Sequence, residues 1–220
     1  MQTPEIESAS IVMIGSFNPA IFQPRWLGVQ KLIRTEEAEN AKITTIQPEL
    51  TDFSTEWFQM QVLQSRFQIV SHDPRQYAPL RDLAASIFSI LAHTPITVLG
   101  MSRSFHFQMP SIDSWHAIGH LLAPKEHWNP IMRVPGLRSL LMEGRRTENG
   151  GVLYVKIEPS VKVTYGLFVE VNEEFRLLKD QEPTEGARWV PDRLTEHWDA
   201  ILKYAEGASD HLLSLVKANA

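Results

Sequence analysis

The 220-residue sequence contains no cysteine. Disulfide bonds, thiolate metal ligands, iron–sulfur clusters and cysteine nucleophiles are therefore excluded. The sequence also lacks any run of about 18 apolar residues, the length that a transmembrane helix requires. The first seven residues are acidic and carry no apolar segment of the kind found in secretion signals. We therefore expect a cytoplasmic protein with no membrane partner.

A basic excess is absent as well. The chain has 21 Lys and Arg against 26 Asp and Glu, which gives a net charge of -5. Nucleic-acid-binding modules usually show a basic excess or a basic stripe, so the charge balance argues against a nucleic-acid partner. The densest basic group includes Arg145 and Arg146, and acidic residues interrupt it. We take these two arginines as candidate contacts to a protein partner.

The usual signatures of covalent and nucleotide-driven catalysis are missing. The sequence has no Gly-x-Ser-x-Gly nucleophile elbow and no Gly-Lys-Ser/Thr phosphate-binding loop. His197 and Asp199 are near in sequence, but residues so close on a helix do not face each other. We therefore predict no catalytic residue and no cofactor.

The residues that are present predict one globular α+β domain over 1–220. Apolar residues make up 43% of the chain, enough for a sizeable core. Polar and apolar residues alternate from Trp57 to Leu63, which predicts a strand with one solvated face. Apolar residues recur at helical spacing over Pro79–His93 and over Arg193–Val216, so we expect a long helix in each half.

The order of predicted elements occurs twice, as a strand, a helix, several antiparallel strands and a long helix. This order predicts an internal duplication of 9–93 and 95–217. The two similar β-α-β(2-3)-α halves would form a curved antiparallel sheet with the long helices packed on one face. In the overlay of the halves, residues 57–70 lie on residues 165–178, and Asn172 to Glu174 form a tight turn.

This element order resembles the duplicated saddle of the TATA-box-binding protein fold. It is also similar, more loosely, to the helix-grip sheets that clasp lipids. The resemblance concerns element order alone, because the chain carries no sequence motif of either family, and fold does not fix function. The acidic charge argues against a DNA-binding saddle.

The segment Gly15-Ser16-Phe17-Asn18-Pro19 follows a predicted strand and resembles the opening of the nucleotidyltransferase signature. That resemblance implies two histidines that contact the nucleotide phosphates. Ile21 and Pro24 occupy the matching positions here, so the residues that carry the chemistry are absent. A strand-to-helix turn is the other interpretation of the segment.

Histidines form a second candidate site. His116 and His120 are four residues apart on a predicted helix, Ser111 to Leu122, and therefore share a face. His106 precedes them and would complete a metal site with three ligands. Solvent-facing or hydrogen-bonded histidines are the alternative.

The six tryptophans are many for one domain. Trp128 and Trp189 lie in predicted loops, where burial in the core is less automatic than in a helix or strand. Because tryptophan is enriched at protein interfaces, both are candidate partner contacts. A loop that folds back over the core is the alternative.

These observations predict a non-enzymatic cytoplasmic binding or assembly protein, either a homodimer or a subunit of a larger complex. Two alternatives remain open. The curved sheet and the last helix could enclose a small apolar ligand, as in helix-grip proteins. Alternatively, His106, His116 and His120 could hold the metal of a hydrolase.

Overall fold

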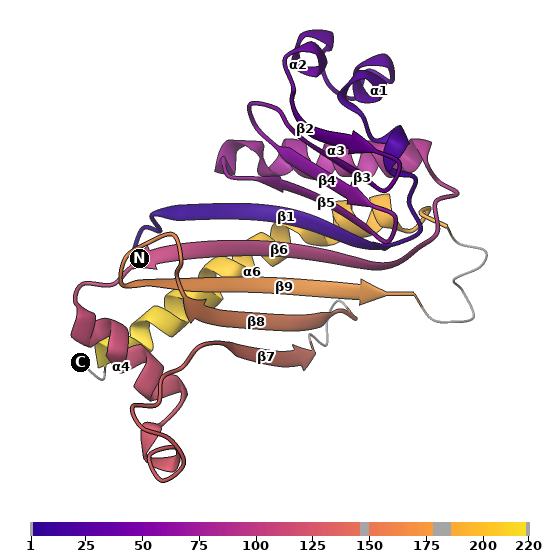
Figure 1. Cartoon of the computed structure of the whole chain (residues 1–220). Coiled ribbons are helices and arrows are strands. Elements are labelled where there is room, and N and C mark those ends of the chain that lie inside the picture. Colours follow the sequence, from indigo (N-terminus) through magenta and orange to yellow (C-terminus); the bar gives the residue numbers. More distant parts are fainter. Residues whose placement is uncertain (1, 146–149, 178–185, 219–220) are drawn as a thin grey trace.

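A computed structural model describes residues 2–145, 150–177 and 186–218. Its centre is one nine-stranded sheet in the order β2-β3-β4-β5-β1-β6-β9-β8-β7, and all neighbouring strands are antiparallel (Figure 1). The α+β class with an antiparallel sheet is therefore confirmed.

The strands are β1 (Ile6–Gly15), β2 (Lys42–Gln47), β3 (Leu50–Ser54), β4 (Gln59–Leu63), β5 (Arg66–Ser71), β6 (Ile96–Gln108), β7 (Leu140–Arg145), β8 (Val152–Pro159) and β9 (Gly166–Arg176). The α-helices are α1 (Pro24–Val29), α2 (Thr35–Glu39), α3 (Tyr77–Ile90), α4 (Ile112–Leu122) and α6 (Val190–Ala218). Three short 3-10 helices are η1 (Pro19–Ile21), η2 (Pro74–Gln76) and η3 (Lys125–His127).

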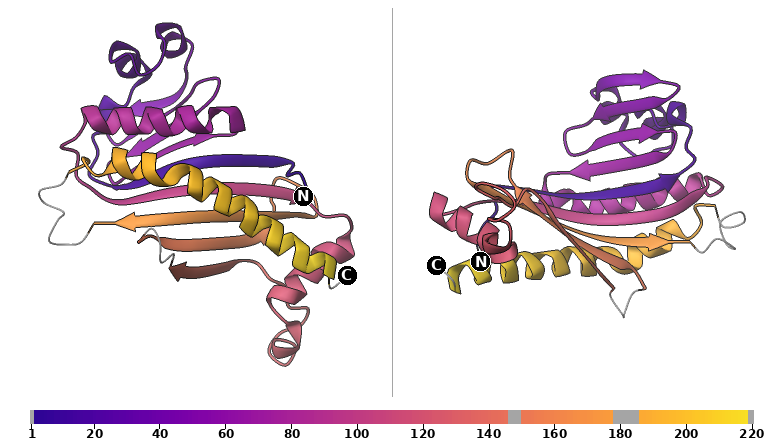
Figure 2. Two further views of the ribbon diagram at one scale, coloured as in Figure 1. Left: turned by 180° about the vertical axis from the view of Figure 1, so that it is seen from behind. Right: turned by 60° about the horizontal axis from the view of Figure 1, so that its bottom comes forward.

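Both long helices lie on one face of the sheet. α3 contacts β5 and β1, and α6 contacts β6 and β9. They pass behind the strands in Figure 1 and come to the front in the view from behind in Figure 2. Alternate residues of β1, β5 and β9 are buried against them, for example Ala9, Ile11 and Met13 of β1, whereas β6 is buried on both faces over most of its length. No described helix covers the other face of the sheet, which we call the open face (Figures 1 and 2).

Local sequence explains where the main helices begin. The side chain of Asp73 accepts a hydrogen bond from the Arg75 backbone N–H and caps η2, which leads into α3. Ser111 caps α4, because its hydroxyl accepts the Ser114 backbone N–H at 3.0 Å. Such caps satisfy backbone donors that the first helical turn leaves unpaired.

The Gly15-to-Pro19 segment is a strand-to-helix turn. The carbonyl oxygen of Pro95 would lie 2.1 Å from a Cβ at position 15, so only glycine fits there. The Ser16 backbone N–H donates to that carbonyl oxygen at 2.8 Å. Asn18 then caps η1, and Pro19 begins it. Backbone geometry thus accounts for the motif.

One predicted turn is wrong. Asn172, Glu173 and Glu174 lie inside the continuous strand β9 and pair with β6 and β8. In the first half, the matching positions form the turn between β4 and β5. The overlay of 57–70 on 165–178 therefore places a hairpin on a single strand. The run of three polar residues suggested the turn, but pairing with a strand on each side keeps this segment extended.

Two connecting segments differ in structure. Residues 35–39 form the short helix α2. β7 and β8 pair as the two arms of a hairpin, and part of the connection between them lies outside the described residues. Among the described residues, no helix is both long and apolar enough to span a membrane.

Candidate functional site

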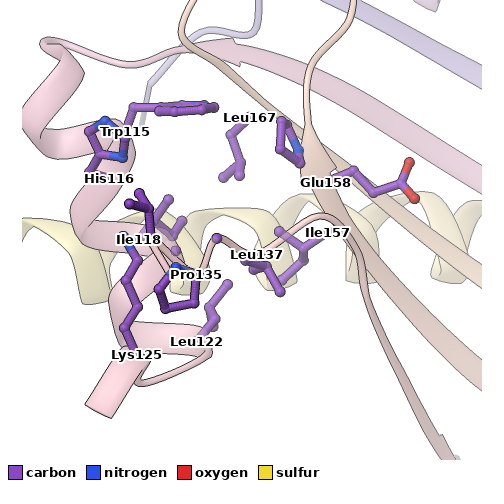
Figure 3. A pocket seen from close by; sticks show the side chains of 14 residues that line it. Trp115, His116, Ile118, Leu122, Lys125, Pro135, Leu137, Ile157, Glu158 and Leu167 are labelled. Carbon is purple, nitrogen blue, oxygen red and sulfur yellow. The ribbon is translucent and has the colours of Figure 1, made fainter. Parts of the chain in front are cut away.

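An apolar cavity of about 180 Å³ lies between α4, the segment after it and the ends of β8 and β9 (Figure 3). Trp115, Ile118 and Leu122 line it from α4, and Ile157 and Leu167 line it from the strands. The indole N–H of Trp115 donates to the Gly166 carbonyl oxygen at 3.0 Å, which holds α4 against the sheet. Ligand pockets usually measure about 300–1,000 Å³, so this cavity by itself is small.

A larger apolar groove of about 720 Å³ lies beside the cavity, and the two share Leu122 and Ile157. The groove runs between α4, α6, β7 and β8. Val155 lines it, together with the exposed side chains of Met142 and Tyr204. The helix-facing side of β7 and β8 is thus left partly uncovered.

Exposed apolar side chains concentrate around this groove. Among the described residues, eight of sixteen exposed large apolar side chains fall between residues 112 and 142. These 31 positions are a small part of the chain, so exposed apolar side chains concentrate in one stretch of it. We call this stretch the apolar end; its exposed apolar residues are Leu121, Trp128, Ile131, Met132, Val134, Leu141 and Met142. Leu141 lines the opposite face of β7 from Met142, which lines the groove.

The connector between α4 and β7, residues 123–139, presents much of the apolar end. The backbone N–H groups of Ile131 and Met132 both donate to the Trp128 carbonyl oxygen at 2.9 Å, so this segment is a defined turn. Val134 has a φ of 51° and is 94% exposed. A β-branched residue rarely adopts a positive φ, and such strain is often found where a segment binds something.

The open face of the sheet is concave. A groove of about 360 Å³ on this face contacts residues from β5, β1, β6, β9, β8 and β7. Six neighbouring strands of a flat sheet would span about 24 Å, so one small groove can touch all of them only if the sheet curves. Gly100, Ser102 and Asn172 line this groove. The Asn172 side chain lies over Gly100, and its oxygen accepts a hydrogen bond from the Ser102 hydroxyl at 3.0 Å.

Charged groups gather in this concave groove. Glu170 of β9 lies directly opposite Lys156 of β8, and Arg66 of β5 lines the same groove. The Lys156 ammonium binds Glu158 at 3.0 Å. Burial raises the pKa of the Glu170 carboxyl, and nearby Glu158 adds to this effect, whereas Lys156 and Arg66 oppose it.

A raised pKa predicts how Glu170 affects stability. The fold favours the protonated carboxyl, so this contribution to stability is full below the ordinary pKa of 4.5 and is lost as the pH rises through the raised pKa. Glu170→Gln removes the titration. We expect the variant to unfold at a higher urea concentration than the native chain at pH 7, with a difference that vanishes near pH 4.

Glu158→Gln on the same face is the matched control. Hydrogen bonds from Ser139 and then Lys156 lower the pKa of the Glu158 carboxyl, so its contribution is present at neutral pH and is lost in acid. This variant should therefore be less stable than the native chain at pH 7. Equal shifts of both variants in the same direction would contradict the assignment of opposite environments.

The structure does not gather the three histidines around one point. His106 is buried on the open face, where its Nδ1 lies 2.8 Å from the Ser160 hydroxyl and its ring lies 4.9 Å from that of Phe168. Burial lowers the pKa of His106. His116 lines the cavity of Figure 3, and His120 is exposed one turn further along α4. Among the described residues, no three His, Asp or Glu side chains form a group that could hold a metal ion.

The candidate partner contacts divide into two groups. Trp128 is 47% exposed and belongs to the apolar end. Trp189 instead packs against the core, and its indole N–H donates to the Ile96 carbonyl oxygen at 3.3 Å. Arg145 is exposed at the end of β7, whereas Arg146 lies outside the described residues. Of the four candidate contacts, Trp128 and Arg145 are therefore the ones that the structure shows to be exposed.

Most residues of the apolar end were not predicted as a site, although the sequence carries a signal for them. Ile131, Met132 and Val134 are apolar residues in a Pro-rich connector and follow neither a helical nor an alternating pattern. Apolar residues outside such a pattern cannot be assigned to the buried face of a helix or strand, so their exposure is a reasonable prediction. The concave groove carried no comparable signal, because Arg66 and Glu170 are far apart in sequence and meet only through the curvature of the sheet.

No protein-family model matches the chain, and a search of curated proteins finds no match either.

Proposed function

We propose that the chain is a non-enzymatic cytoplasmic assembly protein that docks onto another protein chain through its apolar end. The observation that carries this proposal is the clustering of exposed apolar side chains over α4, the connector and β7. Contiguous exposed apolar surface on a globular protein typically marks an interaction site.

The composition of the apolar end supports a protein partner. It combines one tryptophan, two methionines and branched aliphatic residues, with Arg145 at its margin. Tryptophan, methionine and arginine are enriched in protein interfaces, and large aromatic side chains often dominate their energetics. Trp128 is therefore the expected anchor of the contact.

Site-specific photo-crosslinking in the native host tests the docking. A benzophenone amino acid replaces Trp128, and in a control chain it replaces Val29, which is 70% exposed on α1. We expect one discrete protein adduct from position 128 and none from position 29. Adding Ile131→Glu should reduce the adduct about fivefold, because a carboxylate is costly to bury in an apolar contact.

Two outcomes would overturn the proposal. One is the absence of any adduct from position 128 in a chain that is expressed and folded. The other is the same set of adducts from positions 128 and 29, which would show nonspecific contact. The mass of the adduct identifies the occupant as a second copy or a different chain.

A second candidate function is the binding of a small apolar ligand. It rests on the cavity and on the adjoining groove, and α6 lines the groove. Native mass spectrometry of the gently purified chain tests it. An added mass of a few hundred daltons that disappears on denaturation would favour a ligand, whereas the bare mass of 25.1 kDa would count against one.

We also propose that the chain consists of two related halves, 9–93 and 95–217. The strand order supports this division, because β1 and β6 lie side by side at the centre of the sheet. On each side, the next strand outward leads in sequence to a long helix, from β5 to α3 and from β9 to α6. Independent expression of the two halves, followed by circular dichroism of each and of their mixture, tests the division.

A further inference from the structure

The charged side chains that line the concave groove on the open face are in two different states. The Lys156 ammonium and the Glu174 carboxylate each pair with the residue two positions further along the same strand. The Arg66 guanidinium and the Glu170 carboxyl form no hydrogen bond and no ion pair with another described residue. The groove therefore contains one cation and one acid that the described part of the chain leaves without a partner.

Arg66 and Glu170 face each other across the groove without direct contact. They lie on β5 and β9, and β1 and β6 run between these two strands. Burial raises the pKa of the Glu170 carboxyl, whereas Lys156 and, to a smaller extent, Arg66 lower it, so Arg66 is near enough to act on Glu170 electrostatically. A cation that entered the groove would stabilise the ionised Glu170 carboxylate, which is otherwise costly to bury.

The surface between the two charged groups combines aliphatic side chains with hydrogen-bonding groups. The aliphatic side chains are those of Val12, Ile14 and Val98. Tyr154 and Asn172 lie directly opposite each other on β8 and β9. The Asn172 side chain uses its oxygen to accept the Ser102 hydroxyl, so its amide N–H groups remain available, as does the Tyr154 hydroxyl. The volume of about 360 Å³ is within the range of about 300–1,000 Å³ that is typical of small-molecule pockets.

The two charged groups together select the class of ligand. A purely anionic ligand would pair with Arg66 but would leave Glu170 without a partner, and a purely cationic ligand would do the reverse. An apolar ligand would displace water from both groups and pair with neither, which is costly for buried charge. A ligand that carries both an anion and a cation satisfies Arg66 and Glu170 together.

We propose that the concave groove binds a small zwitterion with an apolar body, an amino acid or a short peptide, whose carboxylate pairs with Arg66 and whose ammonium pairs with Glu170. A guanidinium suits a carboxylate, because it can donate two parallel hydrogen bonds to the carboxylate oxygens. Of the apolar end, Leu141 alone lines this groove. The inference therefore goes beyond the proposed assembly function and does not depend on it.

Isothermal titration calorimetry at pH 7 tests the class of ligand. The probes are L-leucine and leucyl-leucine, each also in its N-acetyl form, which lacks the ammonium, and in its C-terminal amide form, which lacks the carboxylate. We expect at least one parent compound to bind, and its two blocked forms to bind about tenfold more weakly, because each loses a charge-assisted pair. Binding of leucine alone identifies a free amino acid as the ligand, and binding of leucyl-leucine alone identifies a peptide.

Variants assign each charge of the probe to its residue. In Glu170→Gln, N-acetylation should no longer weaken binding, whereas amidation still should. Arg66→Met should show the opposite pattern. Glu39→Gln on α2 and Arg75→Met on η2 are matched controls at exposed positions outside the groove, and they should bind every probe as the native chain does. Circular dichroism of each variant checks that it is folded.

Three results would overturn the inference. Neither parent compound binds the native chain at concentrations up to about 10 mM, the blocked forms bind as tightly as their parents, or both blocking effects persist in Glu170→Gln and Arg66→Met. The test is also separate from that of the assembly function. If a probe binds and position 128 captures no protein, the zwitterion site stands and the assembly function fails. If position 128 captures a protein and no probe binds, the reverse holds.

Discussion

Phe67→Ala should lower the free energy of unfolding by about 4 kcal/mol. Phe67 is fully buried between the sheet and α3. Its ring centroid lies 5.0 Å from that of Phe88, 5.6 Å from that of Phe22 and 6.3 Å from that of Phe17. Truncation removes buried apolar area, leaves a cavity and breaks aromatic contacts that add about 0.5–1.5 kcal/mol. Urea unfolding followed by circular dichroism measures the loss.

Phe168→Ala is the matched control. Phe168 lies on the open face of β9 and is only half-buried, with the ring of His106 beside it. We expect a loss of about 1 kcal/mol there, because a half-buried ring loses less area and leaves no enclosed cavity. Equal losses at the two positions would contradict a core confined to the helix-covered face.

Arg103→Met should cost about 3 kcal/mol. Arg103 points from β6 toward the helices and is 10% exposed. Its guanidinium binds Glu7 of β1 at 2.7 Å and Glu206 of α6 at 2.5 Å, and it lies over the Tyr77 ring. Methionine keeps much of the side-chain volume but leaves two carboxylates near each other without their cation. Thermal and urea unfolding at pH 7 measure the cost.

Two further variants make this prediction specific. Arg75→Met breaks the Arg75–Asp73 pair, in which the arginine is 86% exposed, and should leave the urea midpoint nearly unchanged, because solvent screens an exposed pair. Adding Glu7→Leu to Arg103→Met should recover part of the lost stability, since it removes the more buried uncompensated carboxylate. If the double variant is less stable than Arg103→Met, uncompensated charge is not the cause.

Local patterning predicted the elements well where one face of the chain is buried. The helix predicted at 79–93 is α3 at Tyr77–Ile90, and the helix predicted at 111–122 is α4 at Ile112–Leu122. Leu80, Leu83 and Ile87 repeat at helical spacing because a single stripe of α3 packs on the sheet. β9 was interrupted in the prediction, because the charges of Glu173 and Glu174 hid a strand with neighbours on both sides.

The candidate binding surfaces were harder to predict from the sequence than the helices and strands. Trp128 and Trp189 were both predicted to lie in loops, with exposure and burial left open; the Trp128 side chain is exposed, whereas Trp189 packs inward against the core. Both follow turn-forming residues, so local signals do not distinguish them. What separates them is the position of each loop relative to the sheet, which depends on residues distant in sequence.

The sequence by itself determined the α+β class, the principal helices and the absence of cysteine chemistry, because composition and short-range periodicity record which face of each segment is buried. The tertiary structure alone decided the order of the strands, the curvature that brings Arg66 near Glu170, and the exposure of the β7 edge. These features arise from contacts between segments far apart along the chain, and a local pattern carries no record of its distant neighbours.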